Sequence, residues 1–517
     1  MIMIDRVADI ELGQHAGDVV DVTVTAPDGG VVTRPAFCDE AGTWHVRFRT
    51  DTPGRYSLRV GDRQLDHDVT ASEPASPLPQ RIRRERQRLV DEAGTPWLWL
   101  ADTWWFALCD RVGVDELAEL ARQRVEQGYN TVHVVAGLLP EVAAYEDLGE
   151  LAGRWAWKPD WTEPDPTWWA AADERIELIV RSGLLPVIVG AWSYYLLDVG
   201  VPRMTRHWRE VIARWGAHPV VWCIAGEAGL PHYAEIGTPE GDRHSRELIA
   251  GWQEVGTALT ALDAYHSVRT IHPFPLRGLS SAQAVDDPSS SLDLIWMQTG
   301  HSGTWDIEPT LAELERQVGA DHGLPVINSE VCYEGILGGS EASLQRYLCY
   351  AHLLRGAAGH SYGAQGLWAF RRAEDRGPGL PWGGATWQEA AALPGGAQVG
   401  LAGRLLRELG WDRLRPADAS ARPQATTGRR GLPYVARSAD TVVAYIPAAA
   451  LRGPFGWSRL EIDGIDSSWR AELIDPRTGD HHAVDPAFTE LADDGTWTIR
   501  ETAMRTREDW LLVLRKP

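Results

Sequence analysis

Val220-Val221-Trp222-Cys223-Ile224-Ala225-Gly226-Glu227 is an apolar run that ends abruptly in a carboxylate, and Pro325-Val326-Ile327-Asn328-Ser329-Glu330 repeats the pattern. Short runs of this kind are typical of strands that are buried on both faces in a parallel sheet. A glutamate that ends such a strand lies at the carboxyl edge of the sheet, which is the active-site face of a (β/α)8 barrel. The two stretches therefore predict Glu227 and Glu330 on one face of a barrel.

The rest of the central region supports a barrel. Between residues 80 and 418, short apolar segments alternate with longer amphipathic stretches, which we interpret as strands and helices. No Gly-x-Gly-x-x-Gly or P-loop pattern opens a helix, which disfavours a nucleotide-binding, doubly wound sheet. We therefore predict an α/β fold with a (β/α)8 TIM barrel. The eight predicted strands are residues 96–102, 131–137, 185–192, 220–227, 268–272, 292–298, 325–330 and 360–368.

The two ends of the chain have a different pattern. Residues 1–76 and 430–517 alternate apolar and polar residues between Gly-, Pro- and Asp-rich turns, as antiparallel strands do. Residues 71–79 are polar and Pro-rich, which predicts a stiff linker. We expect an N-terminal β-sandwich at 1–76, the catalytic barrel at 80–418 and a small C-terminal antiparallel β domain at 430–517.

Composition excludes several classes of partner. A net charge of −22 over 517 residues argues against binding to nucleic acid or to an anionic membrane surface. No apolar run approaches the roughly 20 residues of a membrane span, and the first residues lack the apolar core of a signal peptide. The five cysteines are scattered, which fits reduced thiols. We expect a cytoplasmic protein, and a homo-oligomer is possible.

Two carboxylates on one barrel face are the groups that glycosidic bond cleavage needs. Glu227 has small neighbours, so it can lie against apolar substrate surface with a raised pKa, which suits a proton donor. Glu330 follows Asn328 and Ser329, whose polar groups could keep it ionised as a nucleophile. A rim salt bridge is the alternative for one such glutamate, but it is a weaker explanation for two. The sequence therefore predicts a glycoside hydrolase.

The other predicted strand ends are polar or aromatic, as expected of a site that binds sugar rings and hydroxyls. The composition agrees, because 25 tryptophans outnumber the 7 phenylalanines and 13 tyrosines together. For any one of these residues, packing in the core or rim is the competing explanation. The predicted substrate-binding residues are Asp102, Trp104, Trp105, His133, Trp192, Tyr194, His272, Gln298, His301 and Trp368.

Two other functions remain open. A metal-dependent barrel hydrolase would need converging His and Asp ligands, and His133, His272 and His301 could meet at the centre. The first predicted strand, however, carries Asp102 and lacks a close His pair. A non-catalytic sugar-binding protein would keep the barrel without turnover, but such proteins commonly lose one carboxylate. We expect a carbohydrate substrate and no metal or organic cofactor.

The chain resembles the apiosidase-like glycoside hydrolases, which have clan A type barrels between two β domains. The resemblance is carried by Trp97-Leu-Trp-Leu-Ala-Asp-Thr-Trp-Trp105, Gln127-Gly-Tyr-Asn-Thr-Val132 and the two glutamate stretches, and it is weakest over residues 1–80. It implies that Glu227 is the acid/base, that Glu330 is the nucleophile and that Asp102, Trp104 and Trp105 bind substrate.

Two positions depart from the family pattern. Gly226 stands where clan A barrels usually have Asn before the acid/base, and Glu227 stands where many apiosidase-like sequences have Asp. The longer side chain moves the proton donor, so the sugar or linkage can differ from that of apiosides. We expect an exo-acting, retaining enzyme that releases a terminal sugar from a small glycoside or oligosaccharide, with a furanoside favoured over a pyranoside.

Overall fold

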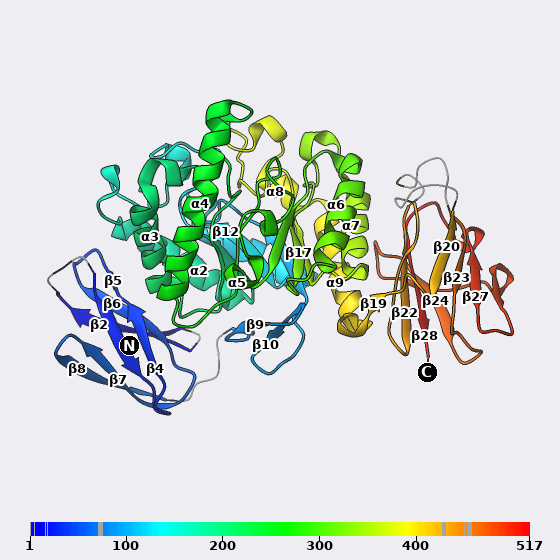
Figure 1. The fold of residues 1–517 in the computed structure, drawn as a ribbon, viewed down its shortest axis with the longest axis horizontal. Coiled ribbons are helices and arrows are strands. Elements are labelled where there is room, and N and C mark those ends of the chain that lie inside the picture. The colour runs from blue at the N-terminus through cyan, green and yellow to red at the C-terminus, as the bar shows by residue number, and fades with distance from the viewer. Residues whose placement is uncertain are drawn as a thin grey trace.

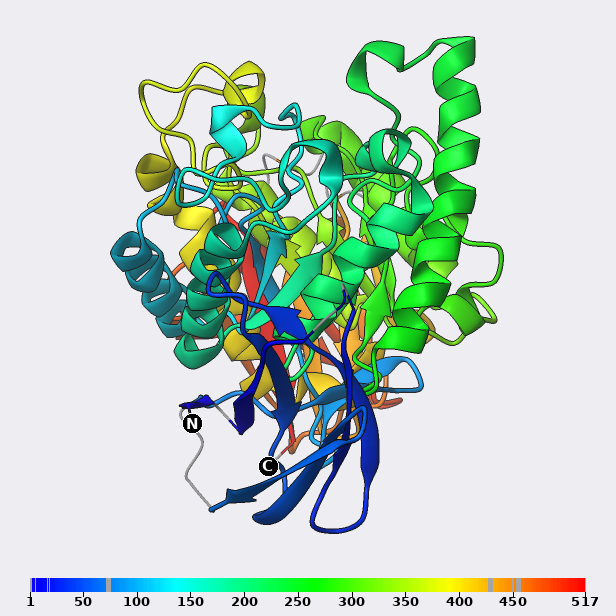
Figure 2. The same ribbon diagram turned by 90° about the vertical axis from the view of Figure 1, so that its left-hand side faces the viewer.

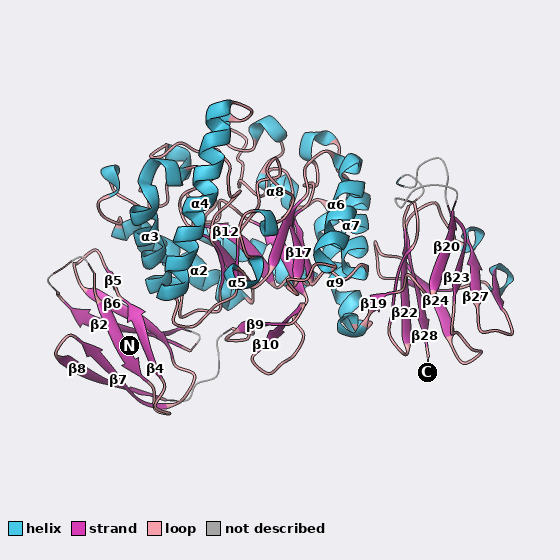
Figure 3. Cartoon of the chain, viewed as in Figure 1, coloured by secondary structure: helices cyan, strands magenta, loops and turns pink. Residues whose placement is uncertain are grey.

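The computed structural model describes residues 2–4, 6–15, 17, 19–70, 76–425, 431–448, 451 and 457–516. Figure 1 shows a central barrel of strands and helices, with one β domain at each end of the elongated molecule. Figure 3 shows that helices surround only the central part. Residues 71–75 of the predicted linker and the predicted start of the last domain, residue 430, lie outside the described residues.

The central sheet confirms the predicted TIM barrel. Eight parallel strands follow one another in the order β15-β14-β13-β12-β11-β18-β17-β16. The ends of this sheet meet, because the Asp293 amide donates to the Arg269 carbonyl at 2.9 Å and the Thr270 hydroxyl donates to the Leu294 carbonyl at 3.1 Å. The strands are β11 (Trp99–Thr103), β12 (Thr131–Val135), β13 (Leu185–Val189), β14 (Val221–Cys223), β15 (Arg269–Thr270), β16 (Ile295–Gln298), β17 (Val326–Glu330) and β18 (Gly359–Tyr362).

Local sequence signals set the helix ends. The Asp165 carboxylate accepts hydrogen bonds from the amides of Thr167 and Trp168 at the start of α2, and Gly183 ends this helix with a φ of 93° that favours glycine. The helices are α1 (Val114–Gln127), α2 (Pro166–Ser182), α3 (Tyr195–Trp215), α4 (Pro239–Leu262), α5 (Pro288–Ser291), α6 (Ile307–Val318), α7 (Ala342–Leu354), α8 (Trp387–Ala391) and α9 (Pro394–Glu408). None of the described helices is long and apolar enough to cross a membrane.

The N-terminal strands form two four-stranded antiparallel sheets, β1-β2-β6-β5 and β4-β3-β7-β8, as the predicted sandwich requires. Three arginines attach this domain to the C-terminal end of α3, where main-chain carbonyls accept their hydrogen bonds. Arg34 donates to the Ile212 carbonyl at 2.8 Å, and Arg47 and Arg49 bind neighbouring carbonyls. The strands are β1 (Ile2–Ile4), β2 (Val7–Gly13), β3 (Asp21–Thr25), β4 (Val31–Pro35), β5 (Phe37–Cys38), β6 (Trp44–Arg49), β7 (Gly54–Val60) and β8 (Arg63–Val69).

The C-terminal strands form sheets β19-β21-β22-β28-β24-β25 and β20-β23-β27-β26. The first sheet packs on the barrel through a buried ion pair, in which Arg346 of α7 binds Asp509 at 2.6 Å. The strands are β19 (Arg415–Pro416), β20 (Ala421–Ala425), β21 (Tyr434–Arg437), β22 (Thr441–Ile446), β23 (Trp457–Ile462), β24 (Arg470–Ile474), β25 (His481–Ala483), β26 (Thr489–Leu491), β27 (Trp497–Arg500) and β28 (Trp510–Arg515).

Two features differ from the sequence-based expectation. A hairpin of β9 (Ile82–Glu85) and β10 (Arg88–Asp91) precedes the barrel and was not predicted. In the rotated view of Figure 2, the N-terminal sandwich lies below the barrel. The eighth strand was predicted to reach Trp368 but ends at Tyr362, because the Ala364 carbonyl accepts turn hydrogen bonds from Leu367 and Trp368. Trp368 therefore lies on the loop above the strand.

Buried histidines should make the fold acid-sensitive. Burial lowers the pKa of five of them, to about 3 or 4 where a value is resolved, so they stay neutral in the folded chain while the unfolded chain protonates near pH 6.5. Stability should therefore fall as the pH drops below about 6.5. Carboxyls with raised pKa values, such as Glu177, act in the opposite sense. The five are His133, His207, His218, His352 and His360.

The sharpest test isolates one of these histidines. His352→Gln removes one proton uptake on unfolding, so the slope of unfolding free energy against pH should flatten by about 1.4 kcal/mol per pH unit between about pH 6 and pH 4. Urea unfolding of the variant and the wild type at several pH values measures this slope. An unchanged slope would show that His352 is protonated in the folded protein.

Candidate active site

Hydrogen bonds to the segments that follow β13 and β15 fix the backbone around Glu227. Gly226 donates its amide hydrogen to the Ala191 carbonyl at 2.9 Å, and Ala228 donates to the His272 carbonyl at 2.7 Å. Between these two anchors, Glu227 has a φ of +47°, a conformation that non-glycine residues rarely adopt. Strain of this kind persists where the surrounding structure over-determines it, commonly at functional sites. Here it turns the side chain of Glu227 into the barrel mouth.

Glu227 lies in an environment that favours its neutral form. Burial raises its pKa to about 7, and the negative charge of Glu330 adds to the effect. Two donors partly offset this shift: the Gln298 amide donates to Oε1 at 3.0 Å, and the Trp192 indole N–H donates to Oε2 at 3.2 Å. At neutral pH a substantial fraction of this carboxyl therefore carries a proton that it can give away.

Glu330 ends β17 and has the opposite environment. Although burial raises its pKa, hydrogen bonds and positive charge from two histidines outweigh burial and hold the pKa well below its usual range. His272 Nε2 is 3.1 Å from Oε2, and His301 Nε2 is 2.9 Å from Oε1. Burial lowers the pKa of His301, but Cys332 and Glu330 together raise it to about 10. Glu330 is therefore an anion at neutral pH.

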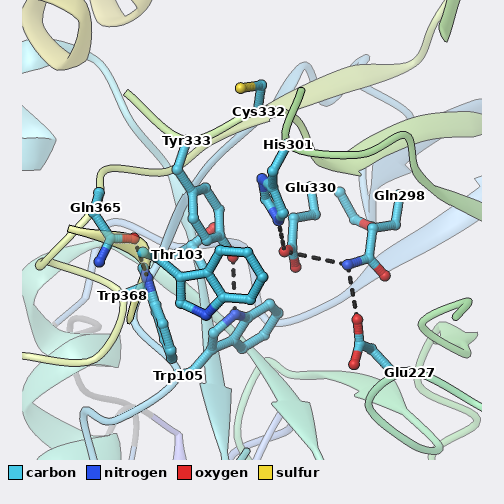
Figure 4. Close-up of polar contacts among 12 residues, drawn as sticks. Thr103, Trp105, Glu227, Gln298, His301, Glu330, Cys332, Tyr333, Gln365 and Trp368 are labelled. Carbon is cyan, nitrogen blue, oxygen red and sulfur yellow. Dashed lines mark hydrogen bonds and ion pairs between the residues drawn. The ribbon is translucent and has the colours of Figure 1, made fainter. Parts of the chain in front are cut away.

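Gln298 joins the two carboxylates. Its Nε2 donates to Glu227 at 3.0 Å and to Glu330 at 3.3 Å, as the dashed lines of Figure 4 show. A break in the register between β16 and β17 makes this possible, because Gln298 pairs with Glu330 while Met297 pairs with Asn328. Such a bulge re-aims side chains next to active sites. The side-chain oxygen Oε1 of Gln298 is buried without a hydrogen-bond partner among the described residues.

Aromatic side chains form the floor beneath the carboxylates. Trp105 donates its indole N–H to the Tyr333 hydroxyl at 3.0 Å and lies 5.7 Å from the His272 ring. His133 stacks below Trp105 at 5.4 Å and packs against Trp296, inside the barrel core. Tyr333, which was not predicted, packs against His301 with tilted rings whose centroids are 4.7 Å apart. Its position three residues after Glu330, just past the end of a predicted strand, could have identified it as a site residue.

Asp102 and Trp104 lie outside this group. The Asp102 carboxylate forms a buried ion pair with Arg124 of α1 at 2.6 Å and accepts the Trp104 indole N–H at 2.9 Å. Both side chains are almost fully buried, between the strand and the helix layer. Alternation along β11 explains the difference, because Thr103 and Trp105 face the interior and Asp102 and Trp104 face outward. Their observed contacts join β11 to α1.

Tyr194 and Trp368 lie at the rim. The Tyr194 hydroxyl donates to the Leu139 carbonyl at 3.0 Å, and Trp368 donates to Gln365 Oε1 at 3.1 Å while its ring lies 6.3 Å from Tyr333. Tyr233 was not predicted as a site residue. It lies on the loop after β14, where burial raises the pKa of its hydroxyl and the charge of Glu227 raises it further.

The unusual glycine before Glu227 has a steric cause. A Cβ on Gly226 would lie 2.2 Å from Cε3 of Trp192, whose ring covers this position. Trp192 therefore occupies the space that a larger residue at 226 would need, and its indole N–H binds Glu227 instead.

No group of three or more His, Cys, Asp or Glu side chains in the described part of the chain has the geometry of a metal site. His133 stacks on the Trp105 ring at 5.4 Å and contacts the Ser361 hydroxyl at 3.4 Å. The histidines at the mouth, His272 and His301, are instead engaged with Glu330.

A family model for the apiosidase-like catalytic domain matches residues 83–413, which include both carboxylates and all their partners. The chain belongs to the apiosidase-like family. It is therefore a glycoside hydrolase, as the paired glutamates predicted. No curated protein matches the chain.

Solved structures share the fold of this apiosidase-like enzyme. One, described as a glycoside hydrolase, has 20% sequence identity and a TM-score of 0.68, over 85% of this chain and 97% of the other. A family 5 glycoside hydrolase from Bacteroides vulgatus has 18% identity and a TM-score of 0.68, over 85% and 95%. Another Bacteroides vulgatus structure covers 99% of both chains at 14% identity, with a TM-score of 0.67. The last of these structures thus matches nearly the whole length of the chain.

The contact between Gly226 and Trp192 can be tested by adding one methyl group. Gly226→Ala should displace the Trp192 ring and cost about 1–3 kcal/mol of unfolding free energy, as overpacking does. Gly384→Ala is the matched control, because a Cβ there meets nothing within 4 Å. Urea unfolding should show a change within about 0.5 kcal/mol for the control. Equal losses in both variants would contradict the steric explanation.

Proposed function

We propose that the protein is a retaining, exo-acting glycosidase in which Glu227 is the acid/base and Glu330 is the nucleophile. The observation that carries this proposal is the contrast between the two carboxyls. Glu227 has a pKa of about 7, and Glu330 is held as an anion by His272 and His301. Two carboxyls whose environments push their pKa values apart are the arrangement that glycosidases use for acid and nucleophile.

The separation of the carboxylates supports retention. One nitrogen of Gln298 lies 3.0 Å from a Glu227 oxygen and 3.3 Å from a Glu330 oxygen, so these oxygens are at most about 6.3 Å apart. Retaining enzymes have carboxyl groups about 5–5.5 Å apart, whereas inverting enzymes need about 6.5–9.5 Å to admit a water molecule. The shorter spacing leaves room for the sugar but not for a water behind it.

The mechanism follows from the two protonation states. The Glu330 carboxylate attacks the anomeric carbon while Glu227 gives its proton to the departing glycosidic oxygen, so the C–O bond to the leaving group breaks as the ester bond forms. Glu227, now an anion, takes a proton from water, whose oxygen attacks the anomeric carbon and releases Glu330. Gln298 donates to both carboxylates and so holds them on either side of one amide nitrogen.

The barrel interior beneath the carboxylates is filled by side chains, as in TIM barrels generally. Trp105, Tyr333 and His133 fill the barrel beneath Glu330, so a sugar enters from the mouth. Aromatic faces suit the apolar face of a sugar ring. A furanoside is the preferred substrate, because the family is named for enzymes acting on apiose, and a pyranoside is second. All five cysteines are free, which supports a cytoplasmic location.

A substrate panel tests the reaction class. Aryl furanosides and pyranosides of both anomers are offered to the wild type and to Glu330→Gln, with EDTA-treated enzyme as the control for metal dependence. We expect one glycone to be hydrolysed, with EDTA without effect and a loss of at least about 10³-fold in the variant. Proton NMR should show the product first in the anomeric configuration of the substrate. First appearance of the opposite anomer would rule out retention, and activity in Glu330→Gln would rule out this nucleophile.

The pH profile tests the proton donor. Because Glu227 must be protonated and has a pKa of about 7, kcat/KM should fall above about pH 7. Glu330 stays ionised far below this pH, so acid inactivation should reflect unfolding. Trp192→Phe removes a hydrogen bond that lowers the pKa of Glu227, and it should move the alkaline limb up by roughly half a unit to one unit. Trp305→Phe, at a side chain 82% exposed, is the control and should leave the limb in place.

A further inference from the structure

A pocket of about 710 Å³ opens on loops that follow four different barrel strands. Two aromatic residues that line it, Tyr194 and Tyr233, relate the pocket to the acid/base. Trp192 donates to Glu227 and is followed two positions later by Tyr194, which lines the pocket. The hydroxyl of Tyr233, a second lining residue, is affected by the charge of Glu227. The volume suits a group of the size of a small organic molecule.

Most polar groups of this pocket already have partners. The Glu141 carboxylate accepts from the Trp382 indole at 2.8 Å and from the Gly379 amide at 2.9 Å. The Tyr194 hydroxyl donates to a main-chain carbonyl, and His232 lies 3.3 Å from the Asp198 carboxylate. What remains for a ligand is largely apolar surface, together with the exposed Arg376. The apolar lining residues are Val142, Ala143, Pro378, Leu380 and Pro381.

The aromatic faces in this pocket are accessible and held in place. Tyr233 is 43% exposed and Trp382 is 38% exposed, although both are large apolar side chains. The loop that carries Trp382 is anchored on one side by Glu141 and on the other by Gln365, which donates to the Gly379 carbonyl at 2.6 Å. Ligands lose less entropy on binding to a surface that is already ordered.

We propose that this pocket holds the leaving group and that the leaving group is a phenol or another planar aromatic alcohol rather than a second sugar. The inference rests on the proposed function, because the acid/base protonates the departing oxygen and the leaving group must therefore lie on the side of Glu227. A sugar in this pocket would lose water from its hydroxyls and find few free hydrogen-bonding groups, which is costly. A planar aromatic ring instead stacks on Trp382 and Tyr233.

Calorimetric titration with 4-methylumbelliferone, a free phenol, tests the pocket without turnover. We expect it to bind the wild type and Glu330→Gln alike. Trp382→Ala should weaken binding roughly three- to tenfold through loss of stacking. Trp382→Phe should keep most of the affinity because it keeps a ring. Trp305→Ala removes an exposed tryptophan that does not line the pocket, and it should bind as the wild type does. Thermal unfolding of each variant shows that it is folded.

The outcomes separate this inference from the proposed function. Binding that depends on Trp382 supports an aromatic leaving-group site even if every glycoside of the panel resists hydrolysis. No binding of 4-methylumbelliferone, or equal binding by Trp382→Ala, overturns it even if glycosides are hydrolysed. Trp382-dependent binding of methyl glucoside or cellobiose in place of the phenol also overturns it, because the pocket would then accept a sugar.

Discussion

A buried carboxyl group must either lose its charge or be matched by partners, and the active site depends on the fact that its two carboxyls meet this constraint differently. Glu330 has two histidines within 3.1 Å and stays ionised. Among the described residues, Glu227 accepts hydrogen bonds from an amide and an indole N–H, so burial and the nearby anion favour its protonated form. Each state supports the other, because the charge of Glu330 helps to keep the proton on Glu227.

The barrel supplies this contrast through main-chain geometry. The register shift between β16 and β17 places Gln298 beside Glu330, and the pinned backbone at position 227 turns its carboxyl toward the same amide. Neither feature depends on the flanking β domains directly. These domains bind the outside of the barrel instead, through arginines at the end of α3 and the ion pair between Arg346 and Asp509.

Gly226, the residue before the acid/base, leaves room for the Trp192 ring. With glycine at 226, the Trp192 ring packs against the main chain and its N–H reaches Glu227. Tyr194, two positions after this tryptophan, lines the apolar pocket. The residue that donates a hydrogen bond to the proton donor is thus two positions from a residue that lines the pocket proposed for the leaving group.

The sequence by itself determined the barrel, the order of its strands and the two glutamates, because buried parallel strands leave long apolar runs whose last residues must lie on one face. Four of the residues that it proposed for substrate binding contact one of those glutamates in the structure: Trp192, His272, Gln298 and His301. Asp102 and Trp104 were also chosen because they lie at a strand end, but their side chains face the helix layer. Successive residues of a strand point to opposite faces, and the shear of the closed barrel determines which of them point inward. Tyr233 and Trp382 lie on loops, whose paths have no periodic signal. The sequence also assigned the proton to Glu227, but from its chain neighbours. Only the tertiary structure decided which groups set each pKa, because His272, His301, Gln298 and Trp192 come from strands far apart in the chain.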